Sequence, residues 1–354
     1  YKRIMVRIND TELRNYGKPF IVAEVGINHN GDLETAFEMI KVAKQSGVDA
    51  VKFQTFKAKE FCGNKSQTFT YKSQNKQITE SIFDMFQRYE LTRDDWFKIK
   101  EKCDEEGILF LSTPQNRPDL DLLLELGLLA IKVGSDDFTN LPLLEDYSTT
   151  NLPMIISCGM SDLSEVNQAL DIIGSFDGYP TILLLCTSQY PTPAEDVNVL
   201  KLKTLSNAFP DLVLGFSDHT QGSLASSLAV GFGAVFFEKH FTLDNNSPGP
   251  DHWFSENPKN LKKWVDDIRK AYTMMGSSLV RPTLKELSMR KVSRRCVVAI
   301  KIIKKGDRLT KENIGLRRAG DGNGLAPILI KHVLGSIALC DLIEGDLLGF
   351  GDFK

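Results

Sequence analysis

The chain lacks a long apolar segment, an excess of charge of either sign and closely spaced cysteines. Its 354 residues carry 43 Lys and Arg against 46 Asp and Glu, so its composition favours neither nucleic acid nor an acidic membrane surface as a partner. No long apolar run follows the amino end at Tyr1, and we therefore expect neither a signal peptide nor a membrane span. These absences predict a cytoplasmic protein that meets any anion at a local site.

The six cysteines are scattered, and none stands at a spacing typical of a zinc site. Several lie inside apolar runs, which predicts buried thiols in a reducing compartment. With 42% hydrophobic and 25% charged residues, the composition is that of a globular protein. A chain of this length can form one large enzyme domain and a small one.

Short β-rich runs alternate with amphipathic helical patterns from residue 18 to about 275, which indicates repeated βα units around a parallel sheet. Eight such units match the size of a (β/α)₈ barrel, also called a TIM barrel. The predicted strands are 20–24, 50–53, 109–112, 130–133, 154–157, 182–186, 213–216 and 234–238. The predicted helices are 33–46, 92–106, 117–126, 163–173, 199–208, 222–229 and 260–275.

One connection, residues 57–89, is longer than the rest, with a polar stretch and then a short apolar-periodic segment at 82–89. Because it follows a strand, it should lie on the face of the barrel that carries active sites. A lid, a dimer contact and a solvated insertion are all consistent with it.

The pattern changes near residue 281 to short strands at 296–302 and 336–339, with glycine turns and no long helix. We therefore divide the chain into a barrel at 1–280, a basic linker at 281–295 and a compact β-rich domain at 296–354. The last is near the lower size for independent folding, so we expect it to be docked on something.

Every predicted strand ends in a side chain that can bind or catalyse. Barrel active sites are assembled at the carboxyl ends of the strands, so polar groups at all eight ends predict an enzyme. The residues are Glu24, Lys52, Gln54, Ser112, Thr113, Lys132, Ser135, Ser157, Thr187, Ser188, Ser217, His219, Glu238 and His240.

Lys52 and Lys132 are flanked by apolar residues, and a buried ammonium group needs an anion. Together with the hydroxyls at neighbouring strand ends, they predict a site for a phosphate or a carboxylate. A Schiff-base lysine is the rival chemistry, because desolvation lowers the pKa of a lysine. Simple pairing of the two lysines with Glu24 or Glu238 would make the cluster structural instead.

His219 and His240 follow two successive predicted strands, so both imidazoles should emerge at the carboxyl face of one sheet. Beside Glu24 they offer nitrogen and oxygen ligands suited to Mn²⁺, Mg²⁺, Fe²⁺ or Zn²⁺, and we predict that they bind a metal. His29 and His252 are weaker candidates, for contacts with a substrate.

Several motifs resemble those of the sialic acid synthase family. They are FIVAEVGINHNG at 20–31, VKFQT at 51–55, LSTP at 111–114, the stretch from Cys186 to Pro191, GFSDH at 215–219 and EKHFT at 238–242. The segment from Cys296 onward resembles the small antifreeze-like (SAF) domain of that family, including a relative of its sugar-facing loop at 318–322. The resemblance runs through nearly the whole chain.

This resemblance implies a condensation of phosphoenolpyruvate (PEP) with an N-acetylated hexose, giving a nine-carbon 2-keto-3-deoxy sugar acid and phosphate. It implies that His219 and His240 hold a divalent metal, Mn²⁺ or Mg²⁺, which would polarise the aldehyde of the open-chain sugar. It also implies a domain-swapped homodimer, in which Arg318 of one subunit reaches the sugar bound by the other.

The same resemblance assigns the remaining roles residue by residue. The implied catalytic residues are Glu24, Lys52, Lys132, Asp137 and Glu238, with Glu24 orienting or deprotonating a water or a sugar hydroxyl. The implied PEP-binding residues are Lys52, Gln54, Thr113, Lys132, Ser135, Ser157 and Ser217. The implied sugar-binding residues are Ser188, Tyr190, Asp251 and Arg318.

Three positions depart from the family pattern. Asp136 and Asp137 follow Ser135 where a glutamate is common, Ser188 stands where an asparagine is common, and Ala319 replaces the loop proline. All three are expected near the sugar. They leave the acceptor open between N-acetylmannosamine and the 2,4-diacetamido-trideoxyhexoses that lead to legionaminic and pseudaminic acids.

Two other functions remain to be weighed. One is a lysine-dependent aldolase that uses pyruvate, with Lys132 as the amine. The other is a non-enzymatic carbohydrate-binding or ice-binding protein, in view of the antifreeze-like end. The charged run at 301–308 argues against a flat ice-binding face, and polar side chains at every strand end have no purpose in a binding protein.

Overall fold

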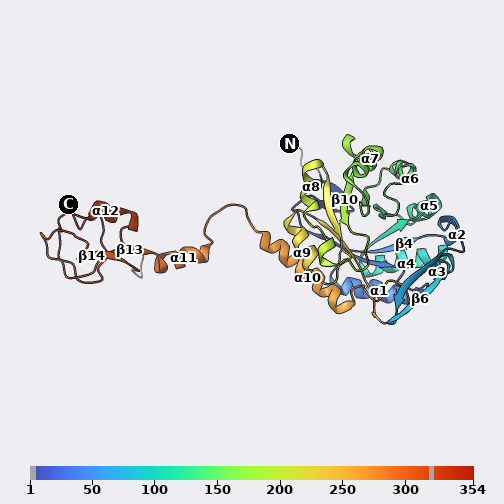
Figure 1. The fold of residues 1–354 in the computed structure, drawn as a ribbon, viewed down its shortest axis with the longest axis horizontal. Helices are drawn as coiled ribbons and strands as arrows, with labels where there is room; N and C mark the ends of the chain where they lie inside the picture. Colours follow the sequence, from blue (N-terminus) through green and yellow to red (C-terminus); the bar gives the residue numbers. More distant parts are fainter. Residues whose placement is uncertain (1–4, 319–322) are drawn as a thin grey trace. The chain divides into compact units, whose positions relative to one another are not determined.

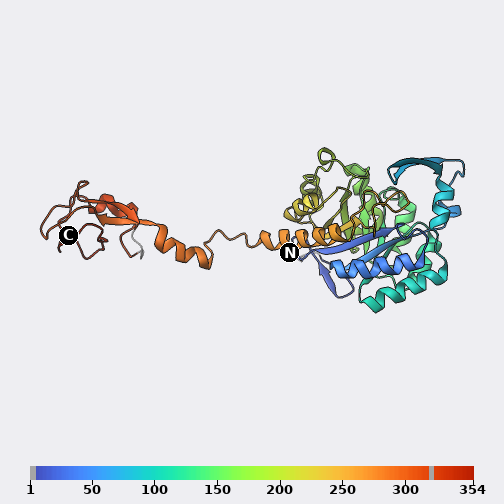
Figure 2. The same ribbon diagram turned by 90° about the horizontal axis from the view of Figure 1, so that it is seen from below.

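The computed structural model describes residues 5–318 and 323–354, and it forms two compact units that divide after Gly276 (Figures 1 and 2). Residues 319–322, which include Ala319 of the predicted sugar loop, lie outside the described residues. The described residues include no helix that is both long enough and apolar enough to span a membrane.

The larger unit is a closed barrel of eight parallel strands, which confirms the predicted fold class (Figure 1). Around the barrel the strands follow the order β10, β11, β12, β3, β4, β7, β8, β9. In chain order they are β3 (Phe20–Gly26), β4 (Ala50–Thr55), β7 (Leu109–Pro114), β8 (Ile131–Val133), β9 (Met154–Ser157), β10 (Thr181–Cys186), β11 (Val213–Ser217) and β12 (Phe236–His240). All eight predicted strands are present.

Helices cover the outside of the barrel, and all seven predicted ones form. The first shows why its limits could be predicted: the Asp32 side chain accepts a hydrogen bond from the Thr35 amide, and Gly47 ends the helix at a φ of 85°. The helices are α1 (Leu33–Ser46), α4 (Arg93–Glu106), α5 (Arg117–Glu125), α6 (Leu141–Ser148), α7 (Leu163–Ile173), α8 (Lys201–Ala208), α9 (Leu224–Gly231) and α10 (Pro258–Met275). Helix α6 was not predicted, and the Asn140 side chain that precedes it makes no cap hydrogen bond.

The amino-terminal end of the barrel is closed by a hairpin that the sequence did not predict, β1 (Val6–Ile8) paired with β2 (Thr11–Leu13). Its apolar side chains belong to the cluster of buried residues that fills this end of the barrel, together with Val22, Ile155 and Phe236. The amino-terminal end of the barrel is therefore a packed core, and the carboxyl-terminal end is the one open to ligands.

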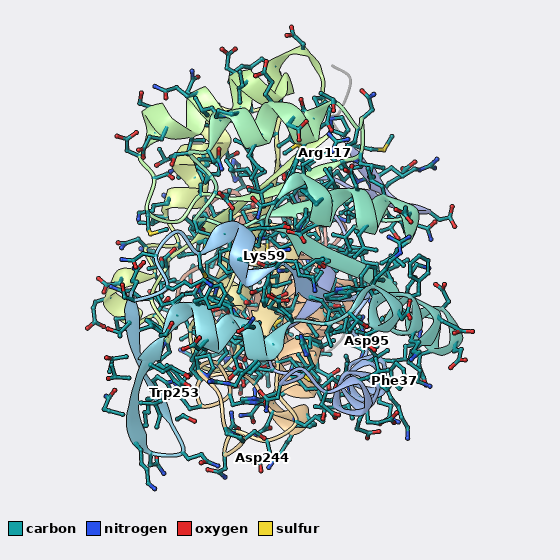
Figure 3. The ribbon with its side chains drawn as sticks, turned by 90° about the vertical axis from the view of Figure 1, so that its right-hand side faces the viewer. Phe37, Lys59, Asp95, Arg117, Asp244 and Trp253 are labelled. Carbon is teal, nitrogen blue, oxygen red and sulfur yellow. The ribbon has the colours of Figure 1, made fainter. Side chains whose placement is uncertain are left out.

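The long connection after β4 folds into α2 (Ala58–Phe61), a hairpin of β5 (Thr68–Ser73) with β6 (Lys76–Ser81), and α3 (Ile82–Tyr89). The hairpin stands at the side of the barrel unit, next to the loop that carries Trp253 (Figure 3). The segment is therefore folded into regular elements and is more than a solvated insertion.

The smaller unit has a core of its own that includes Val297, Leu309 and Leu348. Its elements are α11 (Leu284–Ser293), which lies within the predicted linker, β13 (Arg295–Ala299), β14 (Ile314–Arg318) and α12 (Ile330–Val333). The strand predicted at 336–339 is wrong: Ile337 and Ala338 form only isolated bridges, because short turns separate the backbone segments on either side.

Candidate active site

The site arises from the alternation of side chains along the barrel strands. Interior positions are two residues apart, so Val22 in the apolar layer is followed by Glu24, and Phe236 is followed by Glu238. The interior therefore changes from apolar to polar about halfway along the strands. At Gly215 a side chain is impossible, because a Cβ there would lie 2.4 Å from Leu184 Cδ2.

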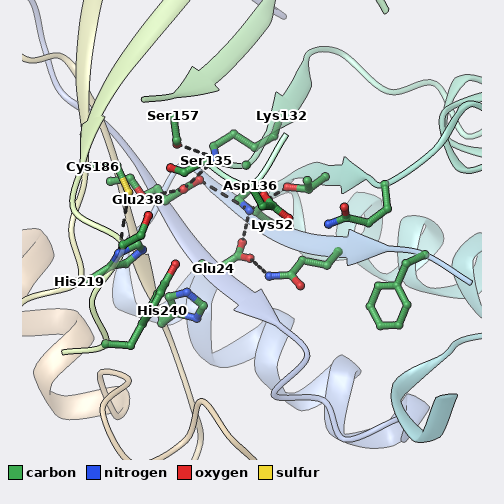
Figure 4. Close-up of a pocket in the computed structure, with 18 of the residues that line it drawn as sticks. Glu24, Lys52, Lys132, Ser135, Asp136, Ser157, Cys186, His219, Glu238 and His240 are labelled. Atoms are coloured by element: carbon green, nitrogen blue, oxygen red, sulfur yellow. Dashed lines mark hydrogen bonds and ion pairs between the residues drawn. The ribbon is translucent and has the colours of Figure 1, made fainter. Parts of the chain in front are cut away.

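Two lysines and two glutamates form a buried ion-pair cluster at the start of this polar layer (Figure 4). Lys52 Nζ lies 2.7 Å from Glu24 Oε2 and 3.7 Å from Glu238 Oε2. Lys132 Nζ lies 3.2 Å from Glu238 Oε1. The pairing that the sequence analysis held open as a structural role therefore exists in the free protein, and an entering anion must compete with it.

The pKa values in the cluster are shifted in opposite directions. Burial raises the pKa of Glu24, and Lys52 opposes this only in part. Burial would also raise the pKa of Glu238, but Lys132 and Lys52 hold it well below its usual range. Burial would lower the pKa of Lys52, but Glu238 and Glu24 raise it instead. Glu24 is thus the carboxylate that most readily takes a proton, and its protonation would leave the cluster with a net positive charge.

Neutral polar groups surround the charged cluster. Lys52 donates to Thr113 Oγ1 at 3.1 Å and Lys132 to Ser157 Oγ at 2.9 Å, while Ser217 donates to Glu238 at 2.9 Å. The charged cluster and these hydroxyls line a chamber of about 510 Å³, here called the first chamber, whose size fits a small ligand. The predicted residues brought together there are Glu24, Lys52, Gln54, Thr113, Lys132, Ser135, Ser157, Ser188, Tyr190, Ser217, His219, Glu238 and His240.

The two histidines meet at the mouth of this chamber, with ring centroids 5.6 Å apart. His219 Nδ1 donates a hydrogen bond to the Thr187 carbonyl at 2.8 Å, which leaves Nε2 as the ring nitrogen that faces a ligand. His240 Nδ1 is buried and finds no hydrogen-bond partner among the described residues. Burial, together with the nearby His219, holds the pKa of His240 well below its usual range, so its imidazole is neutral.

Burial alone would lower the pKa of His219, but the nearby Cys186 raises it, so only His240 is held neutral. Imidazole nitrogens without a hydrogen-bond partner are suited to a divalent cation. The nearest carboxylate is Asp251, whose Oδ2 lies 3.8 Å from His240 Nδ1. No three His, Cys, Asp or Glu side chains within the described part of the chain are arranged to hold a metal. The two imidazoles would therefore hold an ion that accepts nitrogen ligands and completes its coordination with water or substrate oxygens.

A second chamber of about 540 Å³ adjoins the first, and the residues common to both walls are Gln54, Phe69, Phe86, Ser188, Tyr190 and His240. Asp251, a predicted sugar ligand, lines this second chamber. Burial, followed by the charge of Glu24, raises the pKa of Asp251 to about 7. Tyr190 lies against His219, with ring centroids 4.1 Å apart.

Some predicted residues do not reach the site. Asp137 does not line the chamber: its carboxylate accepts a hydrogen bond from Asn140 at 3.0 Å, and the neighbouring Asp136 lies in the chamber wall. Ser112 Oγ forms a hydrogen bond with Thr55 Oγ1 at 2.7 Å and does not line the first chamber. Arg318 belongs to the smaller unit, at the end of β14, so its reach to a sugar stays a prediction.

The two weaker histidine candidates have structural roles instead. His29 is fully buried, and its Nδ1 accepts a hydrogen bond from the Gly31 amide at 3.0 Å. His252 is held between Thr242 Oγ1 at 2.6 Å and Asn30 Oδ1 at 3.0 Å. Both histidines shape loops beside the mouth of the barrel.

The sequence analysis missed several lining residues. Cys186, which was expected only as a buried thiol, has its Sγ 3.8 Å from His219 Nδ1. Gln115 and Met160 line the first chamber just beyond strand ends. An aromatic wall comes from Phe61, Phe69 and Phe86 of the 57–89 segment, together with Phe56 just before it. The alternation of Phe69 and Tyr71 with threonines was the one signal of a strand in that segment.

The chain is similar to several known proteins. The NeuB family matches residues 39–279 and the SAF domain matches residues 294–354. An N,N'-diacetyllegionaminic acid synthase of Legionella pneumophila is 40% identical, and the alignment covers 93% of each chain. One of Campylobacter jejuni is 38% identical over 94% of this chain and 99% of its own length. The crystal structure of the N-acetylneuraminic acid synthetase of Leptospira borgpetersenii superposes with a TM-score of 0.72 at 30% identity, covering 82% of this chain and 98% of that one.

Proposed function

Because the chain belongs to the NeuB family and carries a SAF domain, we propose that it condenses PEP with an N-acetylated hexose to a nonulosonic acid and phosphate. The observation that carries this proposal is that two buried lysines, Lys52 and Lys132, line the same chamber as two histidines, His219 and His240. The lysines suit an anion and the histidines suit a metal. A condensation of an anionic enol with an aldehyde uses both.

PEP would occupy the first chamber. Its phosphate and carboxylate would replace Glu24 and Glu238 as partners of Lys52 and Lys132. The hydroxyls of Thr113 and Ser157, which already accept hydrogen bonds from these lysines, can turn to donate to the anion. Glu24, whose pKa burial raises, can take a proton when Lys52 turns to PEP.

The sugar would occupy the second chamber with its aldehyde near His240, where the chambers meet. The bond forms between carbon 3 of PEP and the aldehyde carbon, and the aldehyde oxygen gains a proton. Water then adds to carbon 2 of the PEP unit, which releases phosphate and leaves the 2-keto acid. Glu24 lies within the same chamber and can transfer the required proton.

A divalent ion held by His219 and His240, which we propose to be Mn²⁺ or Mg²⁺, would supply Lewis-acid polarisation of the aldehyde. The other groups act without it: Tyr190 covers the histidines, and Asp251 faces the sugar chamber. We also propose that the protein works as a homodimer, in which Arg318 of one subunit contacts the sugar of the other. The support for this is the likeness of the smaller unit to the SAF domain.

The aldolase alternative is less well supported. A Schiff-base lysine must lose its proton, whereas Lys132 is paired with Glu238 at 3.2 Å and also donates to Ser157. Glu238 is held in its ionised form by the two lysines. We therefore expect no covalent adduct when the protein is treated with pyruvate and borohydride.

The direct test is phosphate release from PEP by protein that has been stripped with a chelator and reloaded with Mn²⁺. N-acetylmannosamine and the two diacetamido-trideoxyhexoses are supplied in separate assays. Release of phosphate that depends on a sugar, with a matching nine-carbon acid in the mass spectrum, supports the proposal. Trapping of pyruvate on Lys132 without any phosphate release would replace it with the aldolase reaction.

A further inference from the structure

The smaller unit carries a positive charge that the total for the whole chain hides. Residues 277–354 contain 15 Lys and Arg against 8 Asp and Glu, a net charge of +7. Residues 1–276 contain 28 Lys and Arg against 38 Asp and Glu, a net charge of −10. An excess of positive charge in so small a unit attracts anions.

Part of this charge gathers at a pocket of about 590 Å³ inside the smaller unit, where α11 leads into β13 (Figure 1). Helix α11 forms one wall of the pocket. The side chains that it supplies include Leu287, Arg290, Lys291 and Arg294. Their spacing of i, i+3, i+4 and i+7 places them on one face of the helix. Three of these four side chains are cationic.

The facing wall has little side-chain bulk. It consists of Cys296, Gly324, Ala326 and Pro327. Gly324 lies so close to β13 that a Cβ added to it would be 2.8 Å from Cys296 Cβ. The pocket therefore combines a flat, largely apolar wall with long cationic side chains on the opposite side.

The fourth cation of the pocket is Arg295, the first residue of β13. The residue directly opposite it in the antiparallel pair with β14 is Arg318. Like charges in this position destabilise a pair of strands. No Asp or Glu is among the described residues that line the pocket. None of the four cations takes part in an ion pair within the described part of the smaller unit.

The stability of α11 explains only part of this cluster. Cations in the last turn of a helix interact favourably with its dipole, and Arg290 and Lys291 occupy that turn. Arg295 lies in a strand opposite Arg318 and gains nothing from the dipole. The helix has ten residues, none of them buried, and an isolated helix of that length is marginal in water. An anion that bridges α11 and Arg295 would hold the helix against β13.

The number and kind of the cations indicate the class of anion. A carboxylate or a single phosphate group would leave part of the cluster without a counter-charge, whereas a chain of phosphate groups can contact all four cations. Three of the four are arginines, whose planar guanidinium groups bind phosphate oxygens in pairs. We propose that this pocket binds a polyphosphate anion, such as the triphosphate group of a nucleotide. This site is separate from the two chambers of the barrel and goes beyond the proposed condensation.

Calorimetric titration of the full chain, stripped of metal, tests the proposal with inorganic triphosphate, ATP and UTP as probes. We expect saturable binding of one anion per chain, with a Kd at least about tenfold lower than that of inorganic phosphate. Equal Kd values for the three probes would mean that the phosphate chain alone is recognised. A lower Kd for the nucleotides would add a contact between the base and the apolar wall.

Arg290→Gln and Arg294→Gln should each raise the Kd of inorganic triphosphate about tenfold. Lys285→Gln is the matched control, because Lys285 is exposed on the same helix but lies outside the described wall of the pocket. Arg290→Lys keeps the charge and loses the paired contact, so its Kd should rise less. Hydrogen exchange of the α11 amides should slow when triphosphate is added to the wild type or Lys285→Gln, but not to Arg290→Gln.

Several results would overturn the proposal. One is the failure of every probe to saturate at physiological ionic strength. Equal losses in Lys285→Gln and Arg290→Gln would reduce the effect to net charge, and unchanged binding in Arg290→Gln and Arg294→Gln would place the anion elsewhere in the chain. Tighter binding of a DNA duplex than of any nucleotide would make the cluster a nucleic-acid surface instead. No readout depends on turnover, so the outcome is independent of the proposed condensation.

Discussion

Lys239 of β12 and Asp218, just beyond β11, form a buried ion pair on the outer side of the barrel, with Nζ 3.1 Å from Oδ2. Lys239 also lies 3.7 Å from Glu256 and donates to the Thr220 carbonyl. Because side chains alternate along a strand, this pair lies back to back with the inward-facing His240. The ion pair thus joins the two strand ends that carry the histidines.

Lys239→Met should therefore destabilise the barrel strongly. It leaves two buried carboxylates without their cation, which costs about 3–5 kcal/mol in the free energy of unfolding. Chemical denaturation of the two proteins would measure this loss. Lys262→Met is the control, because Lys262 forms an exposed pair with Asp266 at 2.6 Å, and its loss should cost less than about 0.5 kcal/mol. Equal effects of the two changes would contradict the role given to the buried pair.

Lys132→Met should weaken the binding of PEP. A hydrogen bond to a charged group is worth about 1.5–3 kcal/mol, so the KM of PEP should rise roughly 10–100-fold while the KM of the sugar changes little. Initial-rate measurements with each substrate varied in turn give both constants. Lys59→Met is the control, since Lys59 is exposed on α2 near the mouth (Figure 3). A rise confined to the sugar KM would reverse the assignment of the two chambers.

His240→Ala should abolish rescue by metal. We expect the wild-type protein to lose activity on chelation and regain it with Mn²⁺, and the variant not to recover. Its affinity for Mn²⁺, followed by electron paramagnetic resonance without substrates, should fall by at least about tenfold. His332→Ala, at an exposed position in the smaller unit, should behave like the wild type. Undiminished Mn²⁺ binding by His240→Ala would refute the ligand assignment.

Arg318→Ala should raise the KM of the sugar more than that of PEP. A mixture of this variant with His240→Ala then tests the exchange of domains. If Arg318 acts in the other subunit's site, reassorted dimers regain about one intact site in four, measured at low sugar concentration. No recovery on mixing would mean that Arg318 acts within its own chain or not at all.

Asp119→Asn should flatten the dependence of stability on pH. Burial, and then the charge of Glu60, raises the pKa of Asp119 to about 7 in the folded protein. The folded state holds this proton more tightly than the unfolded chain, so stability falls as pH rises from about 4 to about 7.

The asparagine cannot lose a proton, so between about pH 5 and about pH 8 the variant should gain on the order of 2 kcal/mol relative to the wild type. Denaturation midpoints at the two pH values would show it. Asp171→Asn, at an exposed position on α7, should show no such gain. A parallel decline of Asp119→Asn and wild type would place the pH dependence elsewhere.

The barrel and most of the lining residues could be predicted because both follow from strand periodicity. A polar residue two or four positions after a buried apolar residue of the same strand lies on the same face of that strand. This is why Lys52 and Glu238 could be predicted as lining residues. Beyond the last residue of a strand that rule fails. Asp136 and Asp137 lie in such a loop, and the predicted Asp137 is not the one that lines the chamber.

The aromatic wall could not be predicted for a different reason. Strands β5 and β6 form a two-stranded sheet with little burial, so their sequence lacks a clear apolar face. Their turn uses Gln74 and Asn75 at φ values of 49° and 61°, where the usual turn signal would be an Asn-Gly pair. Two hydrogen bonds that hold the hairpin to the loop before α10 join residues more than 170 positions apart, which no local pattern reports.

The hairpin of β1 and β2 closes the amino-terminal end of the barrel, and the two chambers lie at its other end. Lys132 is only 3% exposed, and the second chamber adjoins the first chamber, which Lys132 lines. A sugar that arrives first blocks the way to the lysines. The two substrates must then bind in a compulsory order, PEP first, and excess sugar slows turnover by delaying PEP's entry.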